Sequence, residues 1–202
     1  MIKLWALALF TATSLLLTAC GAPAAENPQT GSAYATVTDD NGRTVTFDKK
    51  PERIVVTSAS FLDPLYAVGG SVVGRPDSKS KIPDAAKGVT SIGRVYQIDA
   101  EKIIALTPDL VILNKGMNEK LIETLAANNI RTLVLDMKSY DDVKREIGIF
   151  AALTGEKAKG EELVRKMDAD IEAVRTSIPQ EKKRVAIIHS TGQGLSVQLD
   201  GS

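Results

Sequence analysis

Cysteine is nearly absent from this sequence, since Cys20 is the only one among 202 residues. A single Cys cannot form a disulfide within the chain, which excludes a small fold held together by disulfides. The fold must therefore rest on a hydrophobic core, and a hydrophobic content of 44% is enough to build one.

An excess of one charge sign is also absent, because 25 basic residues face 25 acidic residues. A balanced chain offers no electrostatic argument for binding nucleic acid. Histidine occurs once, at His189, so a bare Zn or Mn site built from several His ligands is excluded.

Sequence signals for enzymes are equally sparse. No glycine-rich loop ends in Gly-Lys-Ser/Thr, and residues 192–194 (GQG) are too short for a dinucleotide fingerprint. Ser58 and Ser190 have no possible imidazole partner other than His189, which gives no sign of a catalytic triad. We therefore expect a binding protein and no enzyme. A structural lipoprotein or an enzyme fragment without a transport role is the alternative from a different class.

The first twenty residues are typical of a secretory signal. Lys3 precedes the apolar run Leu4–Leu17, and residues 17–20 (LTAC) match the lipobox, which implies cleavage before Cys20 and its lipidation. An uncleaved membrane helix is the alternative, but the apolar stretch is short for a span and ends at Gly21 and Pro23. We expect an extracytoplasmic, membrane-anchored lipoprotein, at the cell surface or in the periplasm. Residues 21–33 are rich in Ala, Gly, Pro and Ser and predict a flexible tether.

The remaining sequence predicts a small hairpin followed by alternating strands and helices. Asn41-Gly42 favours a tight hairpin turn within residues 34–47. Short β-branched runs predict strands at 54–57, 72–74, 110–113 and 132–135. Between and after them, helical patterns occupy 63–68, 99–106, 118–128 and 140–153. This alternation predicts the α/β class: a parallel-sheet lobe with flanking helices over residues 34–155.

Local signals predict where the helices begin and end. Asp99 is a candidate N-cap, Ser139 with Asp142 resembles a capping box, and Gly155 is a candidate C-terminal stop. Apolar residues then recur at three- and four-residue steps over 156–178, which predicts a long connecting helix at 156–179. Two further strands are expected at 184–188 and 196–199. We interpret residues 180–202 as the start of a second α/β lobe, truncated in this chain.

At this point the sequence resembles a known family, the substrate-binding proteins of ABC importers for ferric siderophores, haem and cobalamin. The segments that carry the resemblance follow the family's order: 37–43 (VTDDNGR), 50–55 (KPERIV), 67–74 (AVGGSVVG), 92–93 (IG) and 101–112 (EKIIALTPDLVI). The resemblance implies two α/β lobes joined by a rigid helix, with the ligand held between them. It also implies an ABC permease as partner and a metal chelate as ligand, with no resident cofactor.

In open α/β sheets, ligands bind beyond the carboxyl ends of the strands. Cations and aromatics at these positions suit a ferric siderophore, or alternatively haem or cobalamin. Each of them also has an ordinary structural interpretation as a solvated loop charge or a packed ring. The predicted ligand-binding residues are Ser58, Ser60, Phe61, Arg75, Arg94, Tyr96, Lys115, Met117 and Tyr140.

Two further roles follow from the resemblance. Glu101 matches the surface Glu by which the first lobe of family members docks onto permease Arg residues, although an acid in a first helical turn is also favoured by the helix dipole. His189, which we expect just after a strand, is a possible haem axial ligand, and Met117 and Tyr96 are the other conceivable iron ligands.

Overall fold

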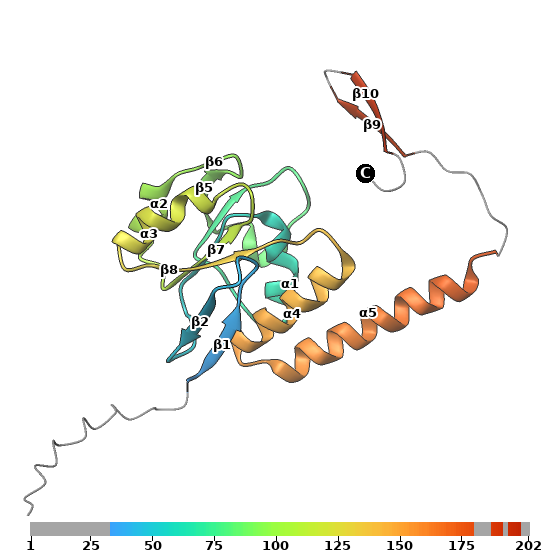
Figure 1. Ribbon diagram of the computed structural model, residues 1–202, viewed down its shortest axis with the longest axis horizontal. Helices are drawn as coiled ribbons and strands as arrows, with labels where there is room; N and C mark the ends of the chain where they lie inside the picture. Colours follow the sequence, from blue (N-terminus) through green and yellow to red (C-terminus); the bar gives the residue numbers. More distant parts are fainter. Residues whose placement is uncertain (1–32, 180–186, 192–193, 199–202) are drawn as a thin grey trace, which may run out of the picture. The chain divides into compact units, whose positions relative to one another are not determined.

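The computed structural model describes residues 33–179, 187–191 and 194–198, and its elements are labelled in Figure 1. The first is a hairpin of antiparallel strands β1 (Ala35–Thr38) and β2 (Thr44–Phe47). Gly42 has a φ of +74°, a conformation that glycine adopts without strain, so the predicted turn is confirmed. The hairpin lies against the edge of the main sheet, where the backbone N–H of Asp40 donates to the carbonyl of Val134 at 2.9 Å.

The main sheet has six strands in the order β6-β5-β4-β3-β7-β8. Every neighbouring pair is parallel except β5 and β6, which are antiparallel. The strands are β3 (Ile54–Val56), β4 (Gly74–Asp77), β5 (Thr90–Arg94), β6 (Gln97–Ile98), β7 (Leu110–Asn114) and β8 (Arg131–Leu135). The chain is thus an α/β protein built on a mostly parallel sheet, as the alternation of patterns predicted.

Helices cover both faces of this sheet. Helices α1 (Leu62–Ala67) and α4 (Tyr140–Thr154) contribute to one apolar cluster, and α2 (Ala100–Ala105) and α3 (Ile122–Ala127) contribute to the other. Single 3-10 turns lie at η1 (Ala59–Phe61), η2 (Asp84–Ala86) and η3 (Glu119–Leu121).

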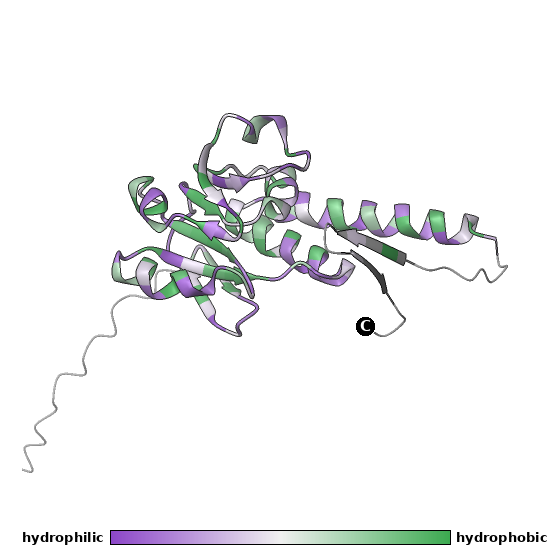
Figure 2. Cartoon of the chain, turned by 90° about the horizontal axis from the view of Figure 1, so that it is seen from above, coloured by the Kyte–Doolittle hydropathy of each residue, from purple (hydrophilic) through white to green (hydrophobic). Residues whose placement is uncertain are grey.

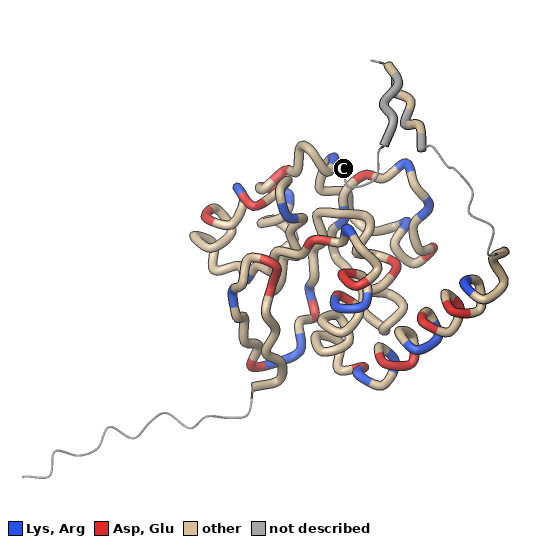
Figure 3. Tube along the Cα trace, turned by 45° about the vertical axis from the view of Figure 1, so that its right-hand side comes forward, with Lys and Arg blue, Asp and Glu red and all other residues tan. Residues whose placement is uncertain are grey.

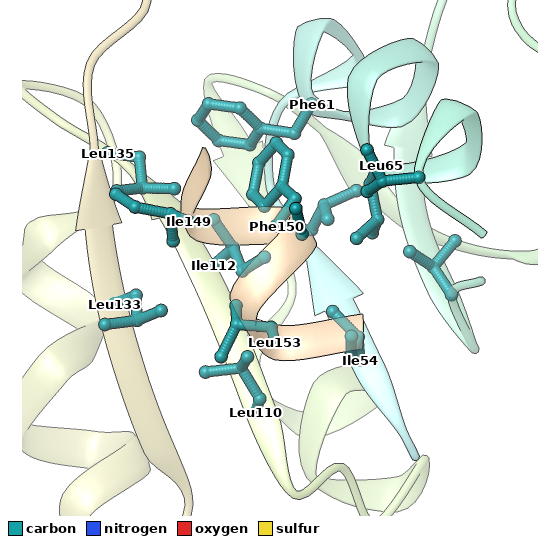
Figure 4. Close-up of a cluster of buried hydrophobic side chains, with 14 of the residues drawn as sticks. Ile54, Phe61, Leu65, Leu110, Ile112, Leu133, Leu135, Ile149, Phe150 and Leu153 are labelled. Atoms are coloured by element: carbon teal, nitrogen blue, oxygen red, sulfur yellow. The ribbon is translucent and has the colours of Figure 1, made fainter. Parts of the chain in front are cut away.

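Strand β7 shows why both faces are buried. Its side chains alternate between the faces, so Leu110 and Ile112 join the α1/α4 cluster while Val111 and Leu113 join the α2/α3 cluster. All four are completely buried. Figure 4 shows Leu110 and Ile112 packed with residues of α1 and α4. A strand apolar at every position is the pattern expected of a parallel sheet covered on both sides.

The predicted helix caps are confirmed. The Asp99 carboxylate accepts the backbone N–H groups of Glu101 and Lys102, and Ser139 and Asp142 form a capping box at the start of α4. Gly155 ends α4 with a φ of +80°.

Helix α5 (Lys157–Ser177) follows α4 after a short turn and crosses it closely at its first turns. A Cβ on Gly160 would lie only 2.6 Å from the Cβ of Ala151, so the crossing depends on glycine. Leu163, Val164 and Met167 pack against the α1/α4 cluster. Farther along α5, Ile171 and Val174 are exposed, as is Ile178 at its C-cap. Figure 2 shows green and purple segments alternating along α5, and Figure 3 shows basic and acidic residues interspersed on it.

The last described strands, β9 (Ile187–Thr191) and β10 (Gly194–Gln198), form an antiparallel pair. Two strands were expected here, but their bounds differ, and residues 184–186 and 199 lie outside the described residues. His189 was expected just after the first strand. It lies within β9 and is paired with Ser196, so that placement was wrong.

The sequence missed β5 and β6 and misplaced β4. Strand β5 buries only Ile92, and β6 has two residues, so neither shows an apolar run. Strand β4 was expected at 72–74 from its valines, but it runs over Gly74–Asp77, where buried Pro76 and half-buried Arg75 follow Gly74. Within the described part of the chain, no helix has the length and apolar character needed to cross a membrane.

Candidate functional site

A cavity of about 410 Å³ opens at the carboxyl ends of β3 and β4, beside the β5–β6 turn. Parallel strands bring loops from distant parts of the sequence to this edge, which is where open α/β sheets bind ligands. The lining residues are Ser58, Ala59, Ser60, Pro76, Asp77, Ser78, Lys79, Arg94, Val95 and Tyr96. Four of the predicted binding residues therefore lie together: Ser58, Ser60, Arg94 and Tyr96.

The floor of the cavity carries hydroxyl groups. Ser58 follows β3, is buried, and caps η1 by accepting the backbone N–H of Ser60 at 3.3 Å. Ser60 is exposed and lines the cavity, and Ser78, the residue after β4, lines it as well. Hydroxyls can both donate and accept, so this wall suits an oxygen-rich ligand.

The cavity is also positively charged. Lys79 and Arg94 are exposed, and neither side chain makes a hydrogen bond or an ion pair within the described residues. The one acid in the lining, Asp77, accepts a hydrogen bond from the Ser91 hydroxyl at 2.7 Å. Two unpaired cations beside one carboxylate give the cavity a preference for anions.

An aromatic side chain stands at the mouth of the cavity. Tyr96 is 79% exposed, a high value for a residue of its size. It lies in the two-residue turn between Arg94 and Gln97, which are paired across β5 and β6. The turn thus presents a cation and an aromatic ring from one short segment.

Two predicted binding residues have other places in the fold. Phe61 is completely buried, and its ring packs edge-on against Phe150 with centroids 6.3 Å apart, so the prediction for Phe61 was wrong. Arg75 lies within β4, and its guanidinium donates to the carbonyls of Ala86, Pro76 and Lys87. Arg75 therefore holds the loop after β4 and does not line the cavity.

The other three predicted binding residues also lie outside the lining of this cavity. The Lys115 ammonium donates to the Asp40 carbonyl at 2.6 Å, and the Tyr140 hydroxyl donates to Asp168 on α5 at 2.9 Å. Met117 lies in the loop after β7 and is 45% exposed. The next residue, Asn118, donates a hydrogen bond to Val95 in the β5–β6 turn. For these three residues, ligand contact stays a prediction.

Ser78 and Lys79 were missed for a definite reason. Because β4 was expected to end at Gly74, Arg75 was placed at the sheet edge. The strand continues to Asp77, so the edge is occupied by Ser78 and Lys79 instead. The predicted end of β4 was three residues too early, so Arg75, the cation predicted for the loop, lies within the strand.

The remaining predicted positions lie outside the lining of this cavity or outside the described residues. Glu101 is exposed in the first turn of α2. Cys20 lies outside the described residues. Across the ranges that the structure describes, no three His, Cys, Asp or Glu side chains converge into a group able to hold a metal ion.

The chain is thus an α/β protein whose mostly parallel sheet has a cavity at the carboxyl ends of its strands, where proteins of this class bind ligands. The chain belongs to the periplasmic binding protein family, whose model matches residues 54–199.

Individual relatives agree with this assignment. The chain is 28% identical over 211 residues to YvrC, an uncharacterized ABC transporter substrate-binding lipoprotein of Bacillus subtilis, covering 94% of this chain and 66% of that protein. It is 35% identical over 128 residues to the Fe(3+) dicitrate-binding periplasmic protein FecB of Escherichia coli, covering 60% of this chain and 41% of FecB.

A solved structure is also similar. The iron uptake ABC transporter substrate-binding protein PiuA of Streptococcus pneumoniae superposes with a TM-score of 0.67 at 26% identity, covering 77% of this chain and 57% of PiuA. The chain thus spans less than two thirds of the length of each of these three proteins.

Proposed function

We propose that this chain is part of an extracytoplasmic solute-binding lipoprotein that captures a ferric siderophore and delivers it to an ABC permease. The observation that carries the proposal is the cavity at the carboxyl ends of β3 and β4, with unpaired Lys79 and Arg94 and the hydroxyls of Ser58, Ser60 and Ser78. Ferric chelates are rich in oxygen and often anionic, so cations and hydroxyl donors match their surface. The similarity to a protein named as binding ferric dicitrate supports the same ligand class.

Calorimetric titration with ferric dicitrate and with a ferric hydroxamate siderophore tests this proposal. We expect saturable binding of at least one of the two complexes, and weaker binding of the anionic ferric dicitrate at high salt because Lys79 and Arg94 act through charge. Tryptophan quenching is unsuitable, because the only tryptophan, Trp5, lies in the predicted signal peptide. If the protein binds neither of the ferric complexes, nor haem, nor cobalamin, its role in solute capture is contradicted.

Haem or cobalamin is the alternative ligand within the same family. Curated relatives include proteins named as cobalamin-binding, at 24% identity. An iron-bound haem needs an axial ligand, and Tyr96, Met117 and His189 are the candidates that the sequence offers. Protein purified from its host with a Soret absorbance band would favour haem over a siderophore.

We further propose a domain organisation that places the cavity between two lobes. Residues 1–20 are the signal peptide, 21–33 the tether, 34–155 the first lobe, 156–179 the connecting helix, and 180–202 the start of a second lobe. A stiff helix between lobes implies small closure on ligand binding compared with binding proteins joined by flexible strands. Small-angle scattering of the complete protein with and without ligand tests this.

Docking to the permease is proposed to use Glu101. Its side chain is exposed in the first turn of α2, three residues after the end of β6. We expect Glu101→Ala to reduce uptake of the ferric complex in cells while leaving its affinity for the isolated protein unchanged. Glu123, an exposed acid in the first turn of α3, provides the matched control. Loss of ligand affinity in Glu101→Ala would contradict the docking role.

The lipid anchor is proposed at Cys20. Two curated relatives are named as lipoproteins of ABC transporters, which supports an anchored form. A diacylated Cys holds a protein firmly at a membrane, whereas one chain does so only marginally. Metabolic labelling with a radioactive fatty acid should mark the protein, and Cys20→Ser should remove the label and release the protein from the membrane.

A further inference from the structure

The turn that carries Arg94 and Tyr96 is held by few contacts of its own. Only two residue pairs, Gly93–Ile98 and Arg94–Gln97, join β5 to β6. Strand β6 is the edge of the sheet, so no strand supports it on the other side. A two-residue strand at a sheet edge provides little rigidity by itself.

One buried amide connects this turn to a different part of the lobe. The side-chain Nδ2 of Asn118 donates to the carbonyl oxygen of Val95 at 3.0 Å. Asn118 lies in the loop after β7, and strands β4 and β3 separate β7 from β5 in the sheet. No other hydrogen bond in the described residues joins residues 94–97 to residues 114–119.

Asn118 is itself firmly placed. It is 2% exposed, its backbone N–H donates to the Asn114 carbonyl at 3.1 Å, and its own carbonyl accepts the N–H of Leu121 at 3.0 Å. Its side-chain Oδ1 is buried without a hydrogen-bond partner within the described residues. An amide that keeps a buried oxygen unpaired carries a cost in stability, so its bond to Val95 is not explained by stability alone.

We infer that Asn118 is a positioning residue for the ligand cavity, and this inference rests on the proposed function. By fixing the Val95 carbonyl, Asn118 holds the turn so that Arg94 and Tyr96 face the hydroxyls contributed by the loops after β3 and β4. Without the bond from Asn118 to Val95, the turn samples several positions, and ligand binding then carries the entropic cost of ordering the turn.

The substitution Asn118→Leu separates positioning from stability. Leucine has a similar size, removes the donor to Val95, and also removes the unpaired Oδ1, so the fold is expected to keep its melting temperature. Asn118→Ala is the second variant, in case leucine does not fit. Asn128→Ala is the matched control, because it deletes an amide-to-carbonyl bond of the same kind, to Thr124, at the exposed C-cap of α3.

Mobility of the turn is measured in the full chain carrying Trp5→Phe and Tyr96→Trp, which makes the tryptophan at position 96 the only one. We expect its fluorescence anisotropy to fall in Asn118→Leu and Asn118→Ala, and to stay unchanged in Asn128→Ala. Affinity for ferric dicitrate, measured with Tyr96 in place, should weaken about tenfold in both Asn118 variants.

Two results would overturn the inference. The first is unchanged anisotropy in a folded Asn118 variant, and the second is reduced anisotropy with unchanged affinity for ferric dicitrate. If the parent protein binds no ferric complex, the proposed function fails. The anisotropy comparison still decides whether Asn118 holds the turn.

Discussion

The carboxylate of Asp39 accepts a hydrogen bond from the backbone amide of Val134 at 3.1 Å, although 95 positions separate the two residues. The same carboxylate pairs with the Arg43 guanidinium at 2.6 Å and is completely buried. Asp39 thereby joins the β1–β2 hairpin to β8, the edge strand of the main sheet. Burial acts to raise the pKa of Asp39, but the hydrogen bonds and charge of Arg43 outweigh it and hold this pKa below its ordinary value.

We predict that Asp39→Ala lowers the free energy of unfolding by on the order of 3 kcal/mol, because it leaves the Val134 amide without its partner and the Arg43 guanidinium without its ion pair. Chemical denaturation measures the loss. Asp48→Ala, at an exposed position after β2, is the control and should change stability little. Because the pKa of Asp39 is depressed in the folded state, its stabilisation is complete above the ordinary pKa and is lost as pH falls through the lowered value. An equal effect of both substitutions would contradict this role.

Glu146 on α4 makes the stability of the fold depend on pH in the direction opposite to Asp39. Its side chain is completely buried, and neither carboxylate oxygen has a hydrogen-bond partner within the described residues. Burial, and next the nearby charge of Asp40, raise the pKa of Glu146 to about 8. The folded protein therefore holds a proton that the unfolded chain releases near the ordinary pKa of glutamate, so stability falls as pH rises from that value to about 8.

We predict that Glu146→Gln removes this dependence. The two proteins should unfold with similar free energies near pH 4, and Glu146→Gln should be more stable at pH 8 by on the order of 4 kcal/mol. Denaturation curves at pH 4, 6 and 8, chosen as roughly spaced conditions across this window, provide the measurement. If the difference in unfolding free energy between the two proteins stays constant with pH, Glu146 does not hold a proton in the folded state.

Two glycines on neighbouring helices give a matched test of the α4–α5 crossing. A Cβ at position 160 would meet Ala151 at 2.6 Å, whereas a Cβ at position 148 has nothing within 4 Å. We predict that Gly160→Ala destabilises by about 1–3 kcal/mol through overpacking. Gly148→Ala should stabilise α4 by about 0.5–1 kcal/mol, because alanine favours helix over glycine. Thermal unfolding of both variants checks the contrast, and changes of the same sign would refute it.

Two arginines separate ligand binding from folding. Arg94 lines the cavity and makes no side-chain hydrogen bond within the described residues, whereas Arg75 donates to three backbone carbonyls. We predict that Arg94→Ala weakens binding of ferric dicitrate about tenfold at unchanged stability. Arg75→Ala should instead lower stability by about 1–3 kcal/mol. Calorimetry paired with denaturation distinguishes the two, and a reversed pattern would place the binding cation at Arg75.

Local sequence was sufficient for the α/β class, the β1–β2 turn, the helix caps at Asp99 and Ser139, and the stop at Gly155. Each depends on residues within a few positions of one another, so their chemistry is visible in the sequence. The buried strands β3, β7 and β8 were also predictable, because two covered faces require continuous apolar runs.

Only the tertiary structure decided which side chains reach the cavity. Phe61 directly follows Ser60 in the sequence, yet it packs on Phe150 of a distant helix. Lys79 lines the cavity in place of the predicted Arg75. The reason is that the end of β4 is set by pairing with its neighbours in the sheet, and not by its own composition. The contact of Asn118 with Val95 and the burial of Glu146 likewise depend on elements far apart in sequence, so no local pattern predicts them.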